Sequence, residues 1–248
     1  MRRSPQIIYT LLITLLSICV SSASLRATAE SDVFAGKEPL GIALEKWAFE
    51  YWKWWLTVPE NVTDIAAVRS DQCILGKDPS GQMLFLMNPY NYHDIKLNCN
   101  ISSESYVLVP LLVGESDPTV PECEKTKCPR KEDLWKTATG PDELFHSAKV
   151  LLDNKLLVEK LGDKESNSTL LKDILVRNSA LFNLTIPENN RYGVAPNTYP
   201  AVVDGRYLVL QPLSVGQHIL YYDYVQKKTD LTGSDDTYGS ITYSFEVE

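Results

Sequence analysis

Side chains that can act as nucleophiles, bases or metal ligands are few in this sequence, and their spacing matches no catalytic motif. The three histidines are His93, His146 and His218, and no G-x-S-x-G elbow supplies a serine nucleophile. The H-E-x-x-H pattern of zinc hydrolases is absent as well. We therefore expect a protein that binds a partner rather than an enzyme, without a metal or another cofactor.

Three smaller features could each be a functional site or have a purely structural role. His93 and Asp94 are a neighbouring histidine and carboxylate, which we interpret as a polar loop rather than a metal site. His218 opens a predicted strand beside a turn, where a hydrogen bond to nearby backbone is the simplest role. An acidic loop could hold Ca²⁺ but lacks the order of an EF-hand, so a solvated turn is favoured. Its carboxylates are Asp230, Asp235 and Asp236.

Carboxylates are abundant, and this abundance keeps one enzymatic alternative open. Aspartate and glutamate together number 32, so pairs of acids must exist, but no spacing marks one pair. Two carboxyl groups about 5 to 9.5 Å apart suffice for glycoside hydrolysis. A secreted hydrolase built on carboxylates is therefore the alternative function. It requires a cleft in which two acids face each other and at least one has a raised pKa.

The amino-terminal residues have the pattern of a secretory signal peptide. Arg2 and Arg3 precede an apolar run over residues 7–20, which is too short to span a bilayer core of about 30 Å. Small residues favour cleavage after Ala23, with a second possible site after Ala29. The mature chain is therefore expected to be secreted, either extracellular or at the cell surface.

The cysteines of the mature chain are expected to form disulfides. Cys19 leaves with the signal, and the four that remain are Cys73, Cys99, Cys123 and Cys128. An even number in an oxidising compartment is typical of disulfides, and four cysteines allow three pairings. We favour Cys123–Cys128, which closes a small loop, and Cys73–Cys99, which ties two segments around a predicted strand. A zinc site competes, but it needs tighter paired spacings.

Secretion also gives meaning to four Asn-x-Ser/Thr sequons. In a host that glycosylates, these asparagines must lie on the surface. The candidate glycosylation sites are Asn61, Asn100, Asn167 and Asn183.

Composition and charge exclude several classes of protein. An apolar content of 44% and a charged content of 23% are ordinary for a globular chain with a core. The formal net charge is −8, and it becomes −10 when Arg2 and Arg3 leave with the signal. Such an acidic protein repels phosphate backbones, so we expect no nucleic-acid partner. We expect signal residues 1–23, a flexible lead-in over 24–39, and one domain over 40–248.

A tryptophan-rich helix is predicted over residues 40–57. Trp47, Tyr51, Trp54 and Trp55 recur at the spacing of one helical face, which we expect to seal the helix onto a sheet. Trp52 falls on the other side and is the candidate for an exposed aromatic contact. It would support at most a peripheral contact with a membrane.

The rest of the chain is dominated by strand patterns. Residues 241–247 alternate between apolar and polar side chains, and Asp153-Asn154 suits the tight turn of a hairpin. Asp204-Gly205 is interpreted as another turn, and a short helix is predicted from Pro141 to near Ala148. Pro110 indicates an edge or a bulge. These patterns predict a β-sandwich of the jelly-roll or immunoglobulin-like kind, with short inserted helices.

Two stretches resemble a family of secreted bacterial and archaeal hypothetical proteins. Residues 47–59 resemble its W-x-x-x-W-W-x-W-x-x-[ST]-[IV]-P helix, and residues 204–218 resemble its D-G-Y-W-x-x-L-x-P-L-x-P-G-x-H segment. Between them lie a cysteine, an apolar strand and a second cysteine, as in the family. The sequence departs from the pattern at Tyr51, at Val215 and over residues 88–94. The resemblance implies secretion and a shared fold, and the family has no established activity.

Together, these observations predict a disulfide-stabilised, glycosylated, non-enzymatic binding or surface-associated module. The partner chemistry that suits it is an extracellular glycan or another extracellular protein.

Overall fold

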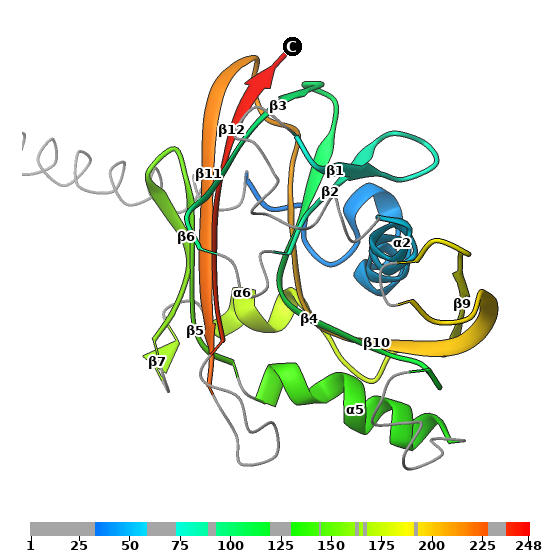
Figure 1. Ribbon diagram of the computed structural model, residues 1–248. Coiled ribbons are helices and arrows are strands. Elements are labelled where there is room, and N and C mark those ends of the chain that lie inside the picture. The colour runs from blue at the N-terminus through cyan, green and yellow to red at the C-terminus, as the bar shows by residue number, and fades with distance from the viewer. Residues whose placement is uncertain are drawn as a thin grey trace, which may run out of the picture.

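Two mixed β-sheets pack against each other in a sandwich, which confirms the predicted fold class (Figure 1). The computed structural model describes residues 33–58, 73–88, 93–119, 130–143, 145–161, 164–165, 168–190, 193–227 and 237–248. Within them, no helix is long and apolar enough to span a membrane.

The first sheet has the strand order β1-β2-β4-β10-β8, with β9 also paired to β10. Its strands are β1 (Leu75–Lys77), β2 (Met83–Leu86), β4 (Tyr106–Ser116), β8 (Leu175–Val176), β9 (Phe182–Ile186) and β10 (Asn197–Leu210). The second sheet has the order β3-β12-β11-β5-β6-β7. Its strands are β3 (Ile95–Ile101), β5 (Phe145–Leu152), β6 (Lys155–Leu161), β7 (Lys164–Glu165), β11 (Gly216–Gln226) and β12 (Thr237–Val247). The β2–β4 and β3–β12 pairs are parallel, and the other described pairs are antiparallel.

The core between the sheets contains two tyrosines, Tyr222 and Tyr243, whose buried hydroxyl groups are hydrogen-bonded. Tyr222 and Tyr243 extend from β11 and β12 and are fully buried. The Tyr222 hydroxyl donates to the carbonyl of Met87, and the Met87 N–H donates to the Tyr243 hydroxyl over 3.0 Å. Because Met87 directly follows β2, these bonds join the two sheets through the core. They also avoid the cost of burying unpaired hydroxyls.

Helix α2 (Leu44–Thr57) lies against the outer side of the first sheet, and a short 3₁₀ turn, η1 (Pro39–Gly41), precedes it (Figure 1). Trp47, Tyr51 and Trp55 are buried, as the spacing predicts, while Trp54 is only partly buried. Trp54 lies directly over Gly76 of β1, where any Cβ would fall 2.2 Å from its ring.

The expectation of an exposed Trp52 is wrong. Trp52 is only 7% exposed, and its Nε1 donates to the hydroxyl of Tyr207 in β10 over 2.8 Å. The curved end of β10 and strand β9 enclose the side of α2 that a simple two-layer arrangement would leave open (Figure 1). Phe49 stacks on Phe182 of β9 with ring centroids 4.2 Å apart. The helix is therefore apolar around most of its circumference because it is buried around most of it.

The predicted helix from Pro141 to near Ala148 is also wrong. Helix α5 (Lys131–Glu143) begins before that range and ends within it, and Ala148 lies in β5. Acidic residues occupy the first turn of α5, which suits the helix dipole. Leu134 and Ala138, one helical turn apart, pack with Val202 of β10. Pro141 lies near the end of α5 instead of its start. Another short helix, α6 (Ser168–Asp173), follows β7.

Asp204-Gly205 does not form the predicted turn, because β10 continues through it. Gly205 has φ +129°, and a Cβ there would come within 2.4 Å of the Leu112 carbonyl oxygen. The register shifts next to this point, where Arg206 pairs with Leu112 but Tyr207 pairs with Pro110. Pro110 therefore stands at a bulge, one of the two alternatives expected for it, between central strands.

The last residues of the predicted lead-in, which the structure describes from Val33, pair with the end of β10. Phe34 forms an antiparallel bridge with Leu210. The Ala35 N–H donates to Val209, and the Gln211 N–H donates to Val33. This segment pairs with the end of β10 because its three apolar residues, Val33, Phe34 and Ala35, pack against the core.

The predicted hairpin at Asp153-Asn154 is confirmed, since both residues have positive φ between β5 and β6. The Cys73–Cys99 disulfide is present too. Cys73 lies just before edge strand β1 of the first sheet, and Cys99 lies in edge strand β3 of the second. The disulfide therefore joins the two sheets. Cys123 and Cys128 lie outside the described residues.

Candidate functional site: a polar hollow on the second sheet

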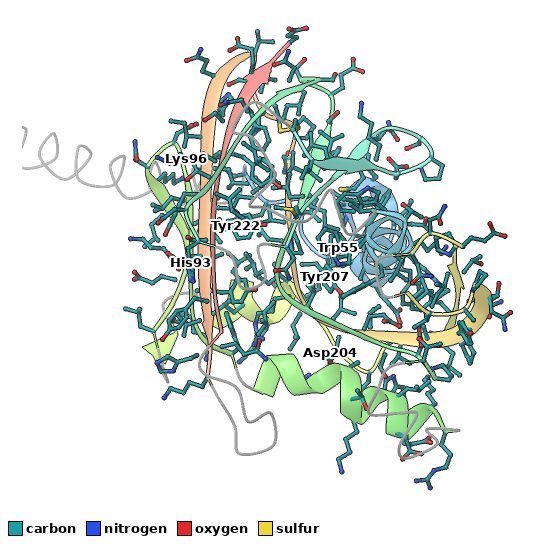
Figure 2. The ribbon with its side chains drawn as sticks, viewed as in Figure 1. Trp55, His93, Lys96, Asp204, Tyr207 and Tyr222 are labelled. Atoms are coloured by element: carbon teal, nitrogen blue, oxygen red, sulfur yellow. A yellow bond between two sulfur atoms is a disulfide. The ribbon has the colours of Figure 1, made fainter. Side chains whose placement is uncertain are left out.

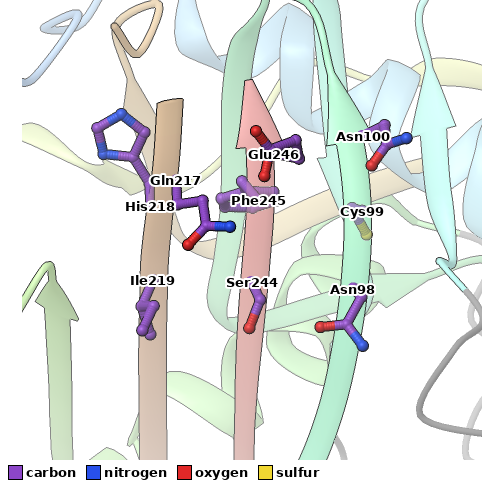
Figure 3. Close-up of a pocket in the computed structure, with 9 residues that line it drawn as sticks. All are labelled: Asn98, Cys99, Asn100, Gln217, His218, Ile219, Ser244, Phe245 and Glu246. Atoms are coloured by element: carbon purple, nitrogen blue, oxygen red, sulfur yellow. The ribbon is translucent and has the colours of Figure 1, made fainter. Parts of the chain in front are cut away.

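A hollow of about 220 Å³ lies on the outer face of the second sheet, over strands β3, β12 and β11 (Figure 3). Its lining comes from three strands that are distant in sequence but adjacent in the sheet. The lining residues are Asn98, Cys99, Asn100, Gln217, His218, Ile219, Ser244, Phe245 and Glu246.

The strand register sets two rows of side chains across the hollow. In one row, Ser244 of β12 lies between Asn98 and Ile219. In the next row, Glu246 lies between Asn100 and Gln217. Residues two apart on a strand share a face, so both rows point to solvent together. Cys99 and Phe245 alternate to the core side, where both are buried, and close the hollow from beneath.

These side chains suit a ligand that carries many hydroxyl groups. Asn98, Asn100 and Gln217 each offer amide donors and a carbonyl acceptor, and Ser244 offers one of each. Glu246 accepts hydrogen bonds and is the one carboxylate in the lining. Ile219 is 50% exposed and adds an apolar surface beside them. Since a hydroxyl both donates and accepts, this set matches hydroxyls better than it matches a charged group.

His218 borders the hollow and forms an arrangement that the sequence alone did not reveal. Its Nδ1 lies 2.7 Å from Oδ2 of Asp153, at the β5–β6 turn. Its Nε2 lies 3.1 Å from the Ser214 Oγ and 2.9 Å from the Ser214 carbonyl oxygen. The Ser–His–Asp distances resemble those of a nucleophilic triad.

The Ser214 carbonyl decides between a triad and a structural contact. A carbonyl oxygen only accepts, so Nε2 must carry a proton to make the 2.9 Å contact favourable. The carboxylate of Asp153 likewise calls for a proton on Nδ1. A histidine protonated on both nitrogens cannot serve as a base toward the Ser214 hydroxyl. When protonated on both nitrogens, His218 holds the β10–β11 connection against the β5–β6 turn, which extends the backbone bond expected from the sequence.

Electrostatics agree with this assignment. Partial burial disfavours the charged form of His218, but the hydrogen bonds to Asp153 and to the Ser214 backbone outweigh it and raise the pKa. The same Asp153 carboxylate accepts from the Ile219 N–H over 2.8 Å. It therefore fixes both His218 and the neighbouring residue of the hollow.

The carboxylates that the hydrolase alternative needs are not in this hollow. Glu115, near the end of β4, has a pKa raised well above its ordinary value by burial and by the charge of Asp117. A raised carboxyl pKa is one requirement of that alternative, but neither acid lines the hollow. No group of three or more histidines, cysteines or acids placed to hold a metal occurs among the described residues.

The other predicted site residues are spread over the molecule. Asn100 lies in the hollow, and Asn183 is exposed on β9. His93 is exposed with its ring near Tyr238, and the Asp94 N–H donates to Ser240, so this pair has loop contacts instead of a ligand geometry. The remaining candidates lie outside the described residues. They are Asn61, Asn167, Asp230, Asp235 and Asp236.

Figure 2 shows Trp55 and Tyr207 near α2 and the first sheet, whereas Lys96 and His93 lie toward the second sheet. The tryptophan cluster is thus part of the core and contributes nothing to the hollow.

No protein-family model matches the sequence, and no curated protein matches it. A mutant of the CFA/I adhesin CfaE from enterotoxigenic E. coli aligns with 65% of this chain at 10% identity, with a TM-score of 0.16. The chain spans about half the length of that adhesin, 49% of it. A TM-score of this size supports no conclusion about fold or function.

Proposed function

We propose that this protein is a secreted, non-enzymatic binding module whose hollow on the second sheet binds an extracellular glycan. The observation that carries the proposal is the pair of side-chain rows across β3, β12 and β11. They gather three amide side chains, a hydroxyl and one carboxylate on a single surface. A rigid sheet holds such groups in fixed positions, which lowers the entropy lost on binding.

Secretion is supported by the sequence pattern and by the disulfide. Disulfides such as Cys73–Cys99 persist in oxidising compartments. The pattern of residues 1–23 is typical of a signal peptide that directs export to such a compartment. Asn100 and Asn183 are exposed, which glycosylation requires. The resemblance of residues 47–59 and 204–218 to a family of secreted proteins also supports secretion.

The test is binding of the mature protein, produced without glycosylation, to a broad panel of immobilised polysaccharides and oligosaccharides. We expect retention on at least one glycan. Asn98→Ala and Gln217→Ala should each weaken it by about 2-fold to 10-fold, the effect of losing one or two hydrogen bonds of ordinary strength. Lys149→Ala is the matched control, since Lys149 lies in the same sheet on β5 but outside the hollow.

Two outcomes would contradict the proposal. If the protein bound none of the glycans, glycans would be excluded as its ligands. Binding that Asn98→Ala and Gln217→Ala leave unchanged would move the site elsewhere on the molecule. Release of cleaved sugar from a bound glycan would instead support the hydrolase alternative.

A further inference from the structure

Asn100 belongs to two features at once. Its side chain lines the hollow, and it is the acceptor of the sequon Asn100-Ile101-Ser102. We propose that N-glycosylation of Asn100 fills the hollow with the protein's own sugar and closes it to external glycans. This inference rests on the proposed function, because it uses the same surface as the ligand site.

The position of Asn100 in the sheet places an attached sugar beside the side chains of the hollow. Asn100 is exposed on β3 and stands in register with Glu246, whose other neighbour is Gln217. A sugar attached to Nδ2 therefore begins at one end of that row. The attached sugar therefore lies next to Glu246 and Gln217, the same side chains that would bind the hydroxyls of an external glycan.

The modification also changes the chemistry of Asn100 itself. An oligosaccharide passes from a lipid-linked diphosphate donor to Nδ2. The bond from nitrogen to the anomeric carbon forms, the sugar–phosphate bond breaks, the lipid diphosphate leaves, and the amide gives up one proton. One of the two N–H donors of Asn100 is thereby lost, so the hollow loses a hydrogen-bond donor as well as its space.

The sequon at Asn183 provides an internal comparison. Asn183 is exposed on β9, which belongs to the first sheet and lies beside α2, away from β11 and β12 (Figure 1). A glycan there has no access to the hollow. Thr185→Ala removes that sequon and Ser102→Ala removes the one at Asn100, and each change leaves its asparagine in place.

The experiment uses wild type, Ser102→Ala and Thr185→Ala, secreted from a glycosylating host and made again in a host that does not glycosylate. Peptide mass mapping reports occupancy at Asn100. Without glycosylation, all three should bind the glycan panel equally. From the glycosylating host, wild type and Thr185→Ala should bind at least about tenfold more weakly, while Ser102→Ala should keep full binding.

A second readout separates failure of this inference from failure of the proposed function. Backbone amide NMR shifts are compared between glycosylated wild type and Ser102→Ala, with no external ligand. We expect differences at Gln217, Ser244 and Glu246. Shift differences in the absence of any glycan binding by the bare chain would overturn only the proposed function. An unoccupied Asn100, or an occupied Asn100 with unchanged binding and shifts, would overturn the inference.

Discussion

His218 connects parts of the chain that are far apart in sequence, and it does so through charge. Its partners are the Asp153 carboxylate at 2.7 Å and the Ser214 carbonyl at 2.9 Å. The sequence indicated only that His218 begins a strand near a turn. Asp153 could not be recognised as its partner, because the two residues meet only when β5 and β11 pair in the second sheet.

We predict that His218 titrates above its ordinary pKa of 6.5 in the folded protein. The folded state then binds this proton more tightly than the unfolded state. The stabilisation is fully present below the unfolded pKa and is lost as the pH rises through the folded pKa. His218→Gln should therefore cost more stability at about pH 5.5 than at about pH 8.5.

NMR titration of the imidazole protons measures the pKa, and Asp153→Asn should lower it. A pKa at or below 6.5 in wild type would contradict the assignment of His218 as a cation.

Glu115 is a second residue whose pKa its surroundings shift, but here burial disfavours the charged form. Its Oε1 is buried without a hydrogen-bond partner among the described residues, and burial raises its pKa well above the ordinary value. Ionised Glu115 therefore destabilises the folded state as the pH rises through the folded pKa. We predict that Glu115→Gln raises the free energy of unfolding near pH 8 by about 1 kcal/mol or more.

Denaturant unfolding at two pH values tests this prediction. The advantage of Glu115→Gln should disappear below the ordinary carboxyl pKa of 4.5, where both side chains are neutral. Equal stability of the two proteins at both pH values would show that Glu115 is not strained by its charge.

At the scale of single elements, local signals predicted those structures that depend on nearby residues. The Asp153-Asn154 hairpin and the alternation of β12 are both present because each is decided within a few residues. Gly205 is the opposite case, because the Asp204-Gly205 pair indicates a turn but lies within β10. Its positive φ serves the close approach of β10 to β4, a contact between strands that are far apart in sequence.

Gly205→Ala tests this interpretation of β10. A Cβ at this position would meet the Leu112 carbonyl oxygen at 2.4 Å and the Val113 Cα at 2.6 Å, and φ +129° is unfavourable for alanine. We expect a loss of at least about 2 kcal/mol in the free energy of unfolding. Gly81→Ala is the matched control, because Gly81 also has positive φ but has open space around it. An equal loss in both variants would show that backbone strain alone matters.

At the scale of the whole molecule, the sandwich class was predictable from strand patterns, but the hollow was not. Its three strands meet through the parallel pairing of β3 with β12, two strands that are far apart in the sequence. The outward positions of Ser244 and Glu246 follow from the alternation in β12. Their apposition to Asn98 and Asn100 depends on the sheet register, which no local pattern specifies.

The Cys73–Cys99 disulfide joins the two sheets, and its loss should affect the entire domain. A separation of 26 residues corresponds to a stabilisation of about 3.5 kcal/mol in the chain-entropy account. The Cys73→Ala/Cys99→Ala double variant should lower the free energy of unfolding by roughly that amount, measured by denaturant titration. A loss below about 1 kcal/mol would indicate that the remaining contacts hold the sheets together without it.

We propose that the rows of polar side chains on β3, β12 and β11 form the ligand site. The most direct measurement is an NMR titration of the unglycosylated, ¹⁵N-labelled protein with an oligosaccharide retained in the binding panel. We expect the amide shifts of Asn98, Gln217 and Ser244 to move first, and Asn98→Ala to reduce these changes. Shifts that move around α2 and the first sheet, with those three residues unchanged, would contradict it.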